Sequence, residues 1–190
     1  MIYFTKELCF NRGNELAKIL VTGGAGFLGS NLVNELMKRG NELIVFDNGF
    51  RQEFNNIEKI KRSISLIKGD VSKKEDWNAI PKDIEFAYHL AAINGTKFFY
   101  EIPEKVLKVN VEGTFNFVDW LRNSQVKRVF FTSSSEVYGF PKIFPTPETE
   151  EMNIPDPTNP RFSYSSSKML GEIIIINFVK SLGIDYSIGR

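Results

Sequence analysis

The feature of the sequence that most restricts its fold is a glycine-rich turn, VTGGAGFLGS, between a short apolar run and an amphipathic segment. Gly24, Gly26 and Gly29 satisfy G-x-G-x-x-G, and Gly23, Gly26 and Gly29 also satisfy G-x-x-G-x-x-G. Glycines at this spacing allow a tight strand-to-helix turn, close approach of backbone amides to a pyrophosphate, and close helix–strand packing. We therefore predict a dinucleotide-binding turn. The alternative is a turn of the same composition that binds no ligand.

Short apolar runs and helical patterns alternate along the rest of the chain. We expect strands at residues 17–22, 41–48, 63–70, 83–92, 126–135 and 183–190, and helices at residues 27–40, 103–123 and 161–182. This alternation is typical of βαβ units that build a parallel sheet covered on both faces. The sequence therefore predicts an α/β fold with a doubly wound parallel sheet.

Two segments fall outside this alternation. Residues 1–16 show no clear pattern, and we expect a loose extension before a single domain at residues 17–190. Residues 141–160 are proline-rich, acidic and aperiodic, which predicts a long surface excursion. Excursions of this length in compact domains are usually functional or disordered.

The composition argues against several classes of function. The formal charge of the 190 residues is only +1, which gives no electrostatic basis for binding nucleic acid or an anionic membrane. Cys9 is the single cysteine, so an intrachain disulfide is impossible, and no apolar run approaches a membrane-spanning length. The start of the chain lacks the apolar run of a signal peptide. We expect a soluble cytoplasmic protein, and we assign no metal site.

Aspartates end the second and third expected strands. Asp47 lies about twenty residues after the glycine turn, where a carboxylate accepts hydrogen bonds from the adenosine ribose and repels a 2′-phosphate. This favours NAD over NADP, although Arg51 lies close enough to accommodate such a phosphate. Asp70 is either a contact for the adenine amino group or an ordinary turn residue.

A second motif, RFSYSSSKM, places a tyrosine and a lysine four residues apart. On a helix Tyr164 and Lys168 share one face, and an ammonium beside a phenol lowers the pKa of the phenol for proton transfer. We expect the three serines between them to be small fillers that let a nicotinamide ribose and a substrate approach. The serine-rich stretch TSSSEVYG precedes the pair at the edge of the sheet where ligands bind in such folds.

These motifs, in this order, resemble the extended short-chain dehydrogenase/reductases. The matching stretches are TGGAGFLG, GD at 69–70, HLAA at 89–92, NVEGT at 110–114, SSSEVYG at 133–139 and Y-x-x-x-K at 164–168. More narrowly, residues 17–190 look like the first part of an NAD-dependent nucleotide-sugar epimerase or dehydratase. The resemblance implies a Rossmann fold with strand order 3-2-1-4-5-6-7 and a smaller C-terminal domain for the nucleotide-sugar. We expect that second domain to be missing from this chain.

The resemblance also implies site residues. Tyr164 matches the family's base, Lys168 its lysine and Ser134 its catalytic serine or threonine. The implied cofactor-binding residues are Gly23, Gly26, Phe27, Leu28, Gly29, Asp47, Asn48, Asp70, Val71, Leu90, Ala91 and Ala92, together with Tyr164 and Lys168. The implied chemistry is transient oxidation of a sugar hydroxyl, usually at C4, with hydride passing to bound NAD and usually returning.

The serine-rich stretch departs from several branches of this family. Dehydratases of the 4,6 type carry Thr-Asp-Glu, whereas Ser135 stands here in place of the aspartate. The Thr-Ser-Glu of UDP-glucuronate decarboxylases is similar to Ser134-Ser135-Glu136, but YSSSKM does not look like their tyrosine helix. Some epimerases also carry this glutamate. Glu136 is therefore a candidate catalytic residue, and a solvated carboxylate at a strand end is the alternative.

Two further polar residues belong to the matching stretches. His89, the single histidine of the sequence, ends an expected strand in HLAA, and we expect it to have a structural role near the cofactor. Asn110 lies on the long helix, where it either supports the site or packs in the core around Gly113.

The two longest expected helices carry apolar residues on more than one face. Examples are Phe115, Phe117, Trp120, Ile173 and Ile176. A helix that is apolar all round is buried. The resemblance implies that these helices pair with those of a second copy, so we expect a homodimer with a four-helix interface.

Two functions of different classes remain open. One is an enzyme that acts on a nucleotide-sugar with NAD, of the epimerase or dehydratase type or similar to a UDP-glucuronate decarboxylase. The other is a non-catalytic NAD-binding module without a substrate domain. The presence of Ser134, Tyr164 and Lys168 favours the enzyme.

Overall fold

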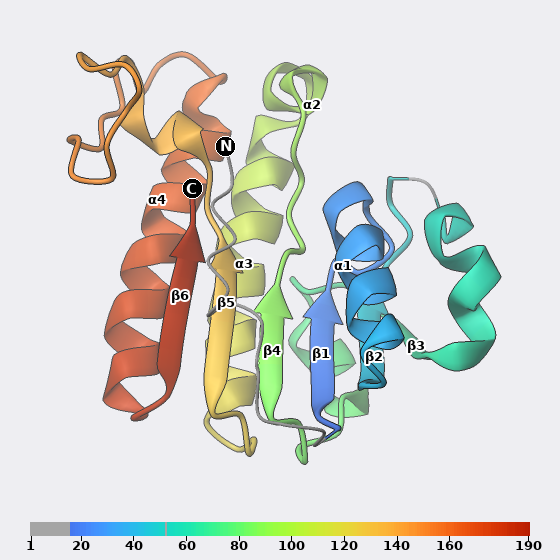
Figure 1. Cartoon of the computed structure of the whole chain (residues 1–190). Coiled ribbons are helices and arrows are strands. Elements are labelled where there is room, and N and C mark those ends of the chain that lie inside the picture. The colour runs from blue at the N-terminus through green and yellow to red at the C-terminus, as the bar shows by residue number, and fades with distance from the viewer. Residues whose placement is uncertain (1–15, 52) are drawn as a thin grey trace.

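A six-stranded parallel sheet forms the centre of the protein in the computed structural model, which describes residues 16–51 and 53–190 (Figure 1). The strands are β1 (Lys18–Thr22), β2 (Glu42–Asp47), β3 (Ser65–Lys68), β4 (Phe86–His89), β5 (Arg128–Thr132) and β6 (Asp185–Gly189). Their order across the sheet is β3-β2-β1-β4-β5-β6, and all neighbours are parallel. The α/β fold of the Rossmann type is thus confirmed. The expected extension falls almost entirely on residues 1–15, outside the described residues.

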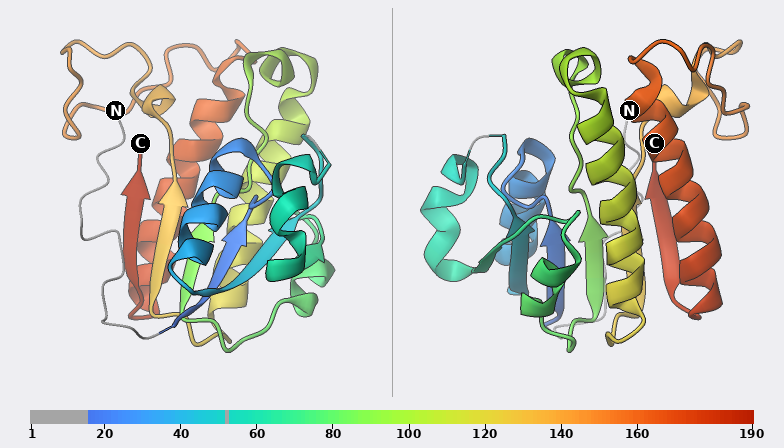
Figure 2. Two further views of the ribbon diagram at one scale, coloured as in Figure 1. Left: turned by 45° about the vertical axis from the view of Figure 1, so that its right-hand side comes forward. Right: turned by 180° about the vertical axis from the view of Figure 1, so that it is seen from behind.

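Helices cover both faces of this sheet. The α-helices are α1 (Phe27–Lys38), α2 (Thr96–Glu101), α3 (Pro103–Leu121) and α4 (Phe162–Ile174). The other helical segments are the 3₁₀ segments η2 (Asn55–Ser63), η3 (Lys74–Ala79) and η4 (Ser135–Tyr138), and the π-helical segment η5 (Ile175–Val179). Figure 2 shows α3 and α4 side by side on one face, with α1 on the other.

The apolar core is divided by the sheet into two layers. Leu20 of β1 belongs to the layer beneath α3 and α4, whereas its neighbours Ile19 and Val21 belong to the layer beneath α1. This follows from the pleat of a strand, which sends successive side chains to opposite faces. Phe117 and Trp120 lie within the larger layer, so they are core residues and are not available to a second copy.

The structure differs from the sequence-based expectation mainly in the lengths of elements. The ladder of β4 ends at His89 and that of β5 at Thr132, several residues before the expected ends. The segment 161–182 is divided into α4 and η5, and its isoleucines are helical despite their preference for strands. Ile174 and Ile175 are almost completely buried, so packing outweighs local propensity here.

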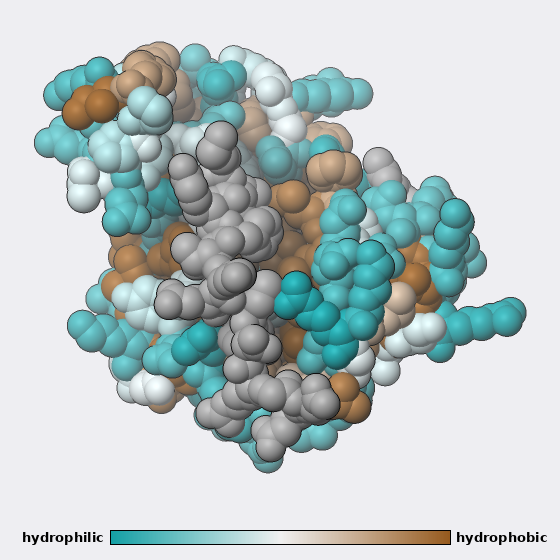
Figure 3. All heavy atoms as spheres, viewed as in Figure 1, coloured by the Kyte–Doolittle hydropathy of each residue, from teal (hydrophilic) through white to brown (hydrophobic). Residues whose placement is uncertain are grey.

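The proline-rich segment is a surface excursion, as predicted. No helix or strand lies between Tyr138 and Phe162, and Figure 1 shows this loop projecting beside the upper end of α4. Ile143 and Phe144 are exposed on it, and Figure 3 shows apolar side chains at its outer end.

Two kinds of feature are absent from the described part of the chain. None of its helices has the length and apolar composition that crossing a bilayer needs. Among the same residues, no three or more histidine, cysteine, aspartate and glutamate side chains gather where they could hold a metal ion.

Candidate active site

The glycine turn brings helix α1 into close contact with the end of β1. A Cβ on Gly29 would lie 2.1 Å from the carbonyl oxygen of Gly23, so no larger residue fits between the turn and the helix. Gly23 has a φ of 70°, which also favours glycine. The N-terminus of α1 has no side-chain cap. Its first amides and the positive end of its dipole therefore remain available to an anion.

A cavity of about 390 Å³ lies in front of this turn. Of the predicted cofactor-binding residues, all except Tyr164 and Lys168 line it. These twelve are Gly23, Gly26, Phe27, Leu28, Gly29, Asp47, Asn48, Asp70, Val71, Leu90, Ala91 and Ala92. They come from the carboxyl ends of β1 to β4, which meet at one edge of a parallel sheet.

Asp47 is held at the end of β2 by backbone donors. Its carboxylate accepts hydrogen bonds from the amides of Gly49, at 2.8 Å, and Ala25, at 3.0 Å. Burial raises the pKa of Asp47, and these two hydrogen bonds oppose that effect. The carboxylate is thus fixed directly beside the glycine turn, where the sequence predicts the adenosine ribose.

Asp70 is a turn residue and a cavity-lining residue at once. Its carboxylate accepts from the amide and hydroxyl of Ser72 and from the side-chain amide of Asn48. Burial alone would raise the pKa of Asp70, but these hydrogen bonds outweigh it and lower the pKa. The turn role is therefore confirmed, and the contact with an adenine amino group stays a prediction.

Several lining residues were not predicted from the motif. Arg51 crosses the opening of the cavity, where it donates to the carbonyl of Asn94 at 2.8 Å and stacks on Phe98. Lys105 lies over the ring of Phe50 at the same rim. The position of Lys105 near the start of α3 is a signal that sequence reasoning could have used, because that helix begins at the ligand-binding edge.

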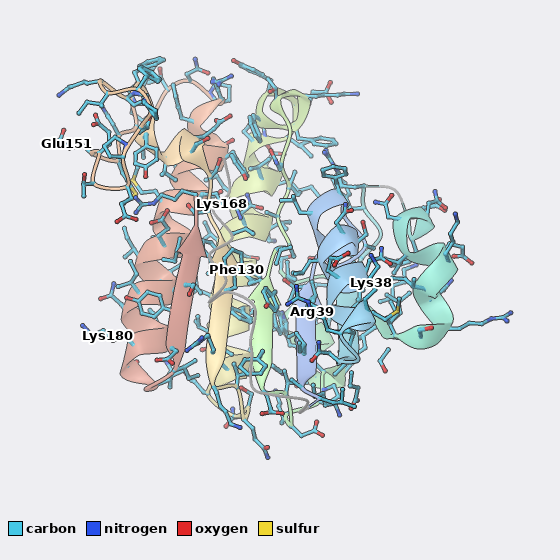
Figure 4. All side chains as sticks on the ribbon, in the orientation of Figure 1. Lys38, Arg39, Phe130, Glu151, Lys168 and Lys180 are labelled. Carbon is cyan, nitrogen blue, oxygen red and sulfur yellow. The ribbon has the colours of Figure 1, made fainter. Side chains whose placement is uncertain are left out.

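Lys168 is buried at the end of β5. It is only 3% exposed, and its ammonium donates to the carbonyl of Thr132 at 2.7 Å. Figure 4 shows Lys168 beside the upper part of β5. Burial lowers the pKa of Lys168 from 10.5 to about 7.

Tyr164 does not have the lowered pKa that the sequence predicts. Burial raises the pKa of Tyr164 to about 12, an effect that the Ser134 side chain opposes and Glu136 reinforces. The phenol ring stacks on Phe99 with the centroids 4.9 Å apart. The physical reason for the difference is that the Lys168 ammonium is directed at the Thr132 carbonyl, and the expected stabilisation of a phenolate is not realised in this geometry.

Two of the three serines between Tyr164 and Lys168 are structural, which corrects the expectation that they are fillers. Ser165 and Ser167 are buried. Ser167 donates to the Tyr164 carbonyl and accepts from the side chain of Asn110 at 3.0 Å. Asn110 also bonds both backbone groups of Ile93. It thereby ties the loop after β4 to the helix that carries Tyr164.

Ser134 and Glu136 lie on the turn that follows β5. Ser134 caps η4 by accepting from the amide of Glu136 at 3.2 Å. Glu136 is partly exposed and lies 3.8 Å from the guanidinium of Arg161. Its carboxylate is close enough to Tyr164 to raise the pKa of that phenol. Ser134, Glu136, Tyr164 and Lys168 are therefore neighbours, beside the cavity but not among the residues that line it.

His89 belongs to the core, in accordance with the predicted structural role. It is 1% exposed, bonds Thr22 Oγ1 through Nδ1 at 2.8 Å, and stacks on Phe117. Burial lowers the pKa of His89 to about 3, and the charge of Lys168 adds to this effect.

This arrangement agrees with a comparison of the sequence with protein families. Residues 19–190 match the NAD dependent epimerase/dehydratase family. The chain belongs to this family.

Known relatives give the same result. UDP-glucuronic acid decarboxylase 5 of Arabidopsis thaliana is 36% identical over 176 residues, which are 91% of this chain and 50% of that protein. The crystal structure of UDP-glucose 4-epimerase from Thermotoga maritima with UDP-glucose superposes with a TM-score of 0.77 at 31% identity, over 90% of this chain and 54% of that one. A Brucella ovis UDP-glucose 4-epimerase in complex with NAD gives 0.75 at 28% identity, over 90% and 50%. The chain spans about half the length of the curated relatives it matches.

Replacing Lys168 with methionine is expected to stabilise the chain near neutral pH. Because burial lowers the pKa of Lys168 from 10.5 to about 7, the unfolded chain binds more protons than the folded chain between these values. The free energy of unfolding of the parent therefore rises with pH across that window. The Lys168→Met variant lacks this charge, so we expect it to be more stable by about 1–3 kcal/mol at pH 7, with the difference narrowing toward pH 10.5.

Urea denaturation of both proteins at several pH values measures this difference. Lys108→Met, at an exposed position on α3, is the control and should leave the pH dependence unchanged. If the free energies of unfolding of the parent and Lys168→Met depend on pH in the same way, the claim that burial lowers the pKa of Lys168 is wrong.

Proposed function

We propose that the cavity binds NAD. The residues fit this cofactor, because the uncapped N-terminus of α1 can receive a pyrophosphate and Asp47 can accept from ribose hydroxyls. A Cβ on Gly26 would meet only the Gly23 carbonyl, at 3.2 Å, which leaves the space in front of it for a ligand. The Asp47 carboxylate beside the turn would repel a 2′-phosphate, which supports NAD over NADP, and Arg51 of the same cavity is bonded to the Asn94 carbonyl.

We further propose that the chain, as part of an enzyme, oxidises a hydroxyl of a nucleotide-sugar transiently, at C4. The observation that carries this proposal is the gathering of Tyr164, Ser134 and Lys168 at the end of β5, next to the strand whose following residues line the cavity. Bound NAD supplies the acceptor for hydride in such chemistry. The protein's part is to hold the sugar hydroxyl with Ser134 and to remove its proton with Tyr164.

The pKa values define what this proton transfer requires. With the pKa of Tyr164 near 12 and that of Lys168 near 7, the phenol is protonated at neutral pH in the described geometry. An ammonium stabilises a phenolate only when it is near the phenol oxygen. Proton removal from the sugar hydroxyl therefore requires a lower pKa of Tyr164 in the complex with cofactor and substrate than in the described geometry.

UDP-sugars are the substrate class that the relatives support. Proteins similar to this chain include UDP-glucose 4-epimerases and UDP-glucuronic acid decarboxylases. Epimerisation and decarboxylation share the oxidation step at C4. Glu136 beside Tyr164 favours decarboxylation as the second candidate, because the Ser134-Ser135-Glu136 run is similar to that of the decarboxylases.

The first test is the affinity for NAD of a variant that fills the space in front of the turn. Gly26→Val is expected to weaken NAD binding at least tenfold, since a branched side chain would occupy the path of the pyrophosphate and each tenfold is about 1.4 kcal/mol. Isothermal titration calorimetry measures the dissociation constant. Gly183→Asn, at a remote left-handed position with open space around it, is the matched control. Equal affinities of the parent and Gly26→Val, or tighter binding of NADP than of NAD by the parent, would contradict the assignment.

The second test is turnover of UDP-sugars. Tyr164→Phe is expected to lose about 10²- to 10⁴-fold in the rate of any product formation while its affinity for NAD changes far less, because the phenol oxygen alone is removed and the ring is kept. UDP-glucose, UDP-N-acetylglucosamine and UDP-glucuronate are offered separately, and products are identified by mass spectrometry and NMR. Release of carbon dioxide from UDP-glucuronate alone would select decarboxylation.

The same assay addresses the non-catalytic alternative. We expect the 190-residue chain to turn over slowly at best, because it spans only about half the length of its relatives. NAD binding without product from any substrate, in this chain and in a protein extended to the length of the relatives, would mean a binding module. Turnover that is unchanged in Tyr164→Phe would contradict the proposed base.

We also propose that α3 and α4 form a homodimer interface. Large apolar side chains are exposed along α3, α4 and the η5 segment that continues α4: Leu107, Phe115, Leu170, Ile173 and Ile176. We infer that they form one apolar patch, which a two-fold axis would bury on both copies.

Light scattering tests the interface. The parent is expected to be dimeric at tens of micromolar, and Ile173→Glu is expected to be monomeric because it buries a charge at the centre of the patch. Phe144→Glu, on the exposed excursion, is the control and should remain dimeric. A monomeric parent at these concentrations would contradict the proposal.

A further inference from the structure

A buried ion pair lies next to the proposed catalytic residues. Glu172 of α4 is completely buried. Arg190, which follows β6, donates to both of its carboxylate oxygens, from Nε at 2.9 and 3.1 Å and from Nη2 at 2.7 Å. Such a fork matches the geometry of a carboxylate, and a carboxylate this deeply buried requires a partner of this kind.

The pair also contacts both sides of the turn that carries Ser134. The hydroxyl of Ser133 donates to Glu172 in a short hydrogen bond. Nη1 of Arg190 donates to the hydroxyl of Tyr138 at 3.0 Å and to the carbonyl of Glu148 at 2.9 Å. Ser133 immediately precedes Ser134, and Tyr138 ends η4. The pair therefore fixes the two flanks of this turn, and with Glu148 it fixes the base of the excursion.

The position of Glu172 on the helix gives the pair a second consequence. Tyr164, Lys168 and Glu172 follow one another at intervals of four residues, so they share one face of α4. Lys168 donates to the Thr132 carbonyl, lies over the rings of Phe131 and Tyr164, and is near enough to His89 to lower its pKa. Glu172 lies one helical turn farther along the same face of α4. It is the single carboxylate of α4, and Arg190 bonds both of its oxygens.

We propose that Glu172 and Arg190 act as a positioning pair, which holds the Ser134 turn against α4 and keeps the Glu172 carboxylate away from Lys168. The inference rests on the proposed roles of Ser134 and Lys168. If Glu172 were free to pair with Lys168, the ammonium would be drawn one turn along the helix, away from Tyr164. Arg190 thus leaves Lys168 available to the phenol.

The test is the pKa of Lys168 in variants of the pair. Side-chain ¹³C NMR follows the titration of lysines, and loss of a signal in Lys168→Arg assigns the resonance. Arg190→Met is expected to raise the pKa of Lys168 by about one pH unit or more, because the released carboxylate stabilises the ammonium. The double variant Glu172→Gln/Arg190→Met carries neither charge, so its Lys168 should titrate as in the parent.

If the pair had only a structural role, the Lys168 pKa would not rise in Arg190→Met and return to the parental value in the double variant. An unchanged Lys168 titration in folded Arg190→Met would overturn the proposal, as would equal shifts in the single and double variants. If Arg190→Met does not fold, Arg190→Lys is used. It keeps a cation for Glu172 but loses the fork, so the Lys168 titration should stay as in the parent while amide exchange rises in residues 133–139.

Hydrogen exchange measures the positioning of the turn. Amides of residues 133–139 are expected to exchange at least about tenfold faster in Arg190→Met, Arg190→Lys and the double variant, since the contacts with Tyr138 and Glu148 are lost. Asp185→Asn, which removes an exposed ion pair with Arg128 at the other end of β6, is the matched control and should leave these amides unchanged. Parental exchange rates in all three variants would overturn the positioning role.

NAD affinity measured on the same proteins separates this proposal from the proposed function. The pair does not line the cavity, so all variants should bind NAD as the parent does. A parent that fails to bind NAD contradicts the proposed function, whereas the NMR and exchange results alone decide the role of the pair.

Discussion

The close contact between the start of α1 and the turn after β1 is the constraint on which the rest of the site depends. Gly29 packs against the Gly23 carbonyl with no space for a Cβ, so the helix begins directly at the edge of the sheet. This places uncapped amides in front of the cavity and brings the Ala25 amide to Asp47. Because the strands are parallel, the ends of β4 and β5 lie at the same edge of the sheet. Ser134, Tyr164 and Lys168, here called the Tyr164 group, lie at the end of β5.

Buried charge determines the state of that group. Lys168 and Glu172 are both almost fully buried on one face of α4. Lys168 donates to the Thr132 carbonyl at the end of β5, and Glu172 pairs with Arg190, which follows β6. Burial makes the ammonium of Lys168 easier to deprotonate and the phenol of Tyr164 harder to deprotonate. The residues proposed for proton transfer are therefore in a protonation state that the transfer has to change.

The sequence predicts the elements better than the contacts between side chains. Glycine spacing and strand alternation are local properties, so the sheet follows from them, whereas most of the twelve lining residues are predicted from the family resemblance. The bond of Arg51 to Asn94 and the pairing of Glu172 with Arg190 join residues distant in sequence, and each depends on one choice of rotamer in the folded chain. The Thr132 carbonyl that holds Lys168 is a backbone group that no residue pattern reveals.

A crystal structure of the chain with NAD tests most directly the claim that the cavity and the Tyr164 group form one site. The account predicts the pyrophosphate at the N-terminus of α1 between Gly23 and Gly29, the adenosine ribose on Asp47, and the nicotinamide end extending past Ala92 to Tyr164 and Lys168. A nicotinamide directed away from Tyr164, or a cofactor bound outside the cavity, would contradict it.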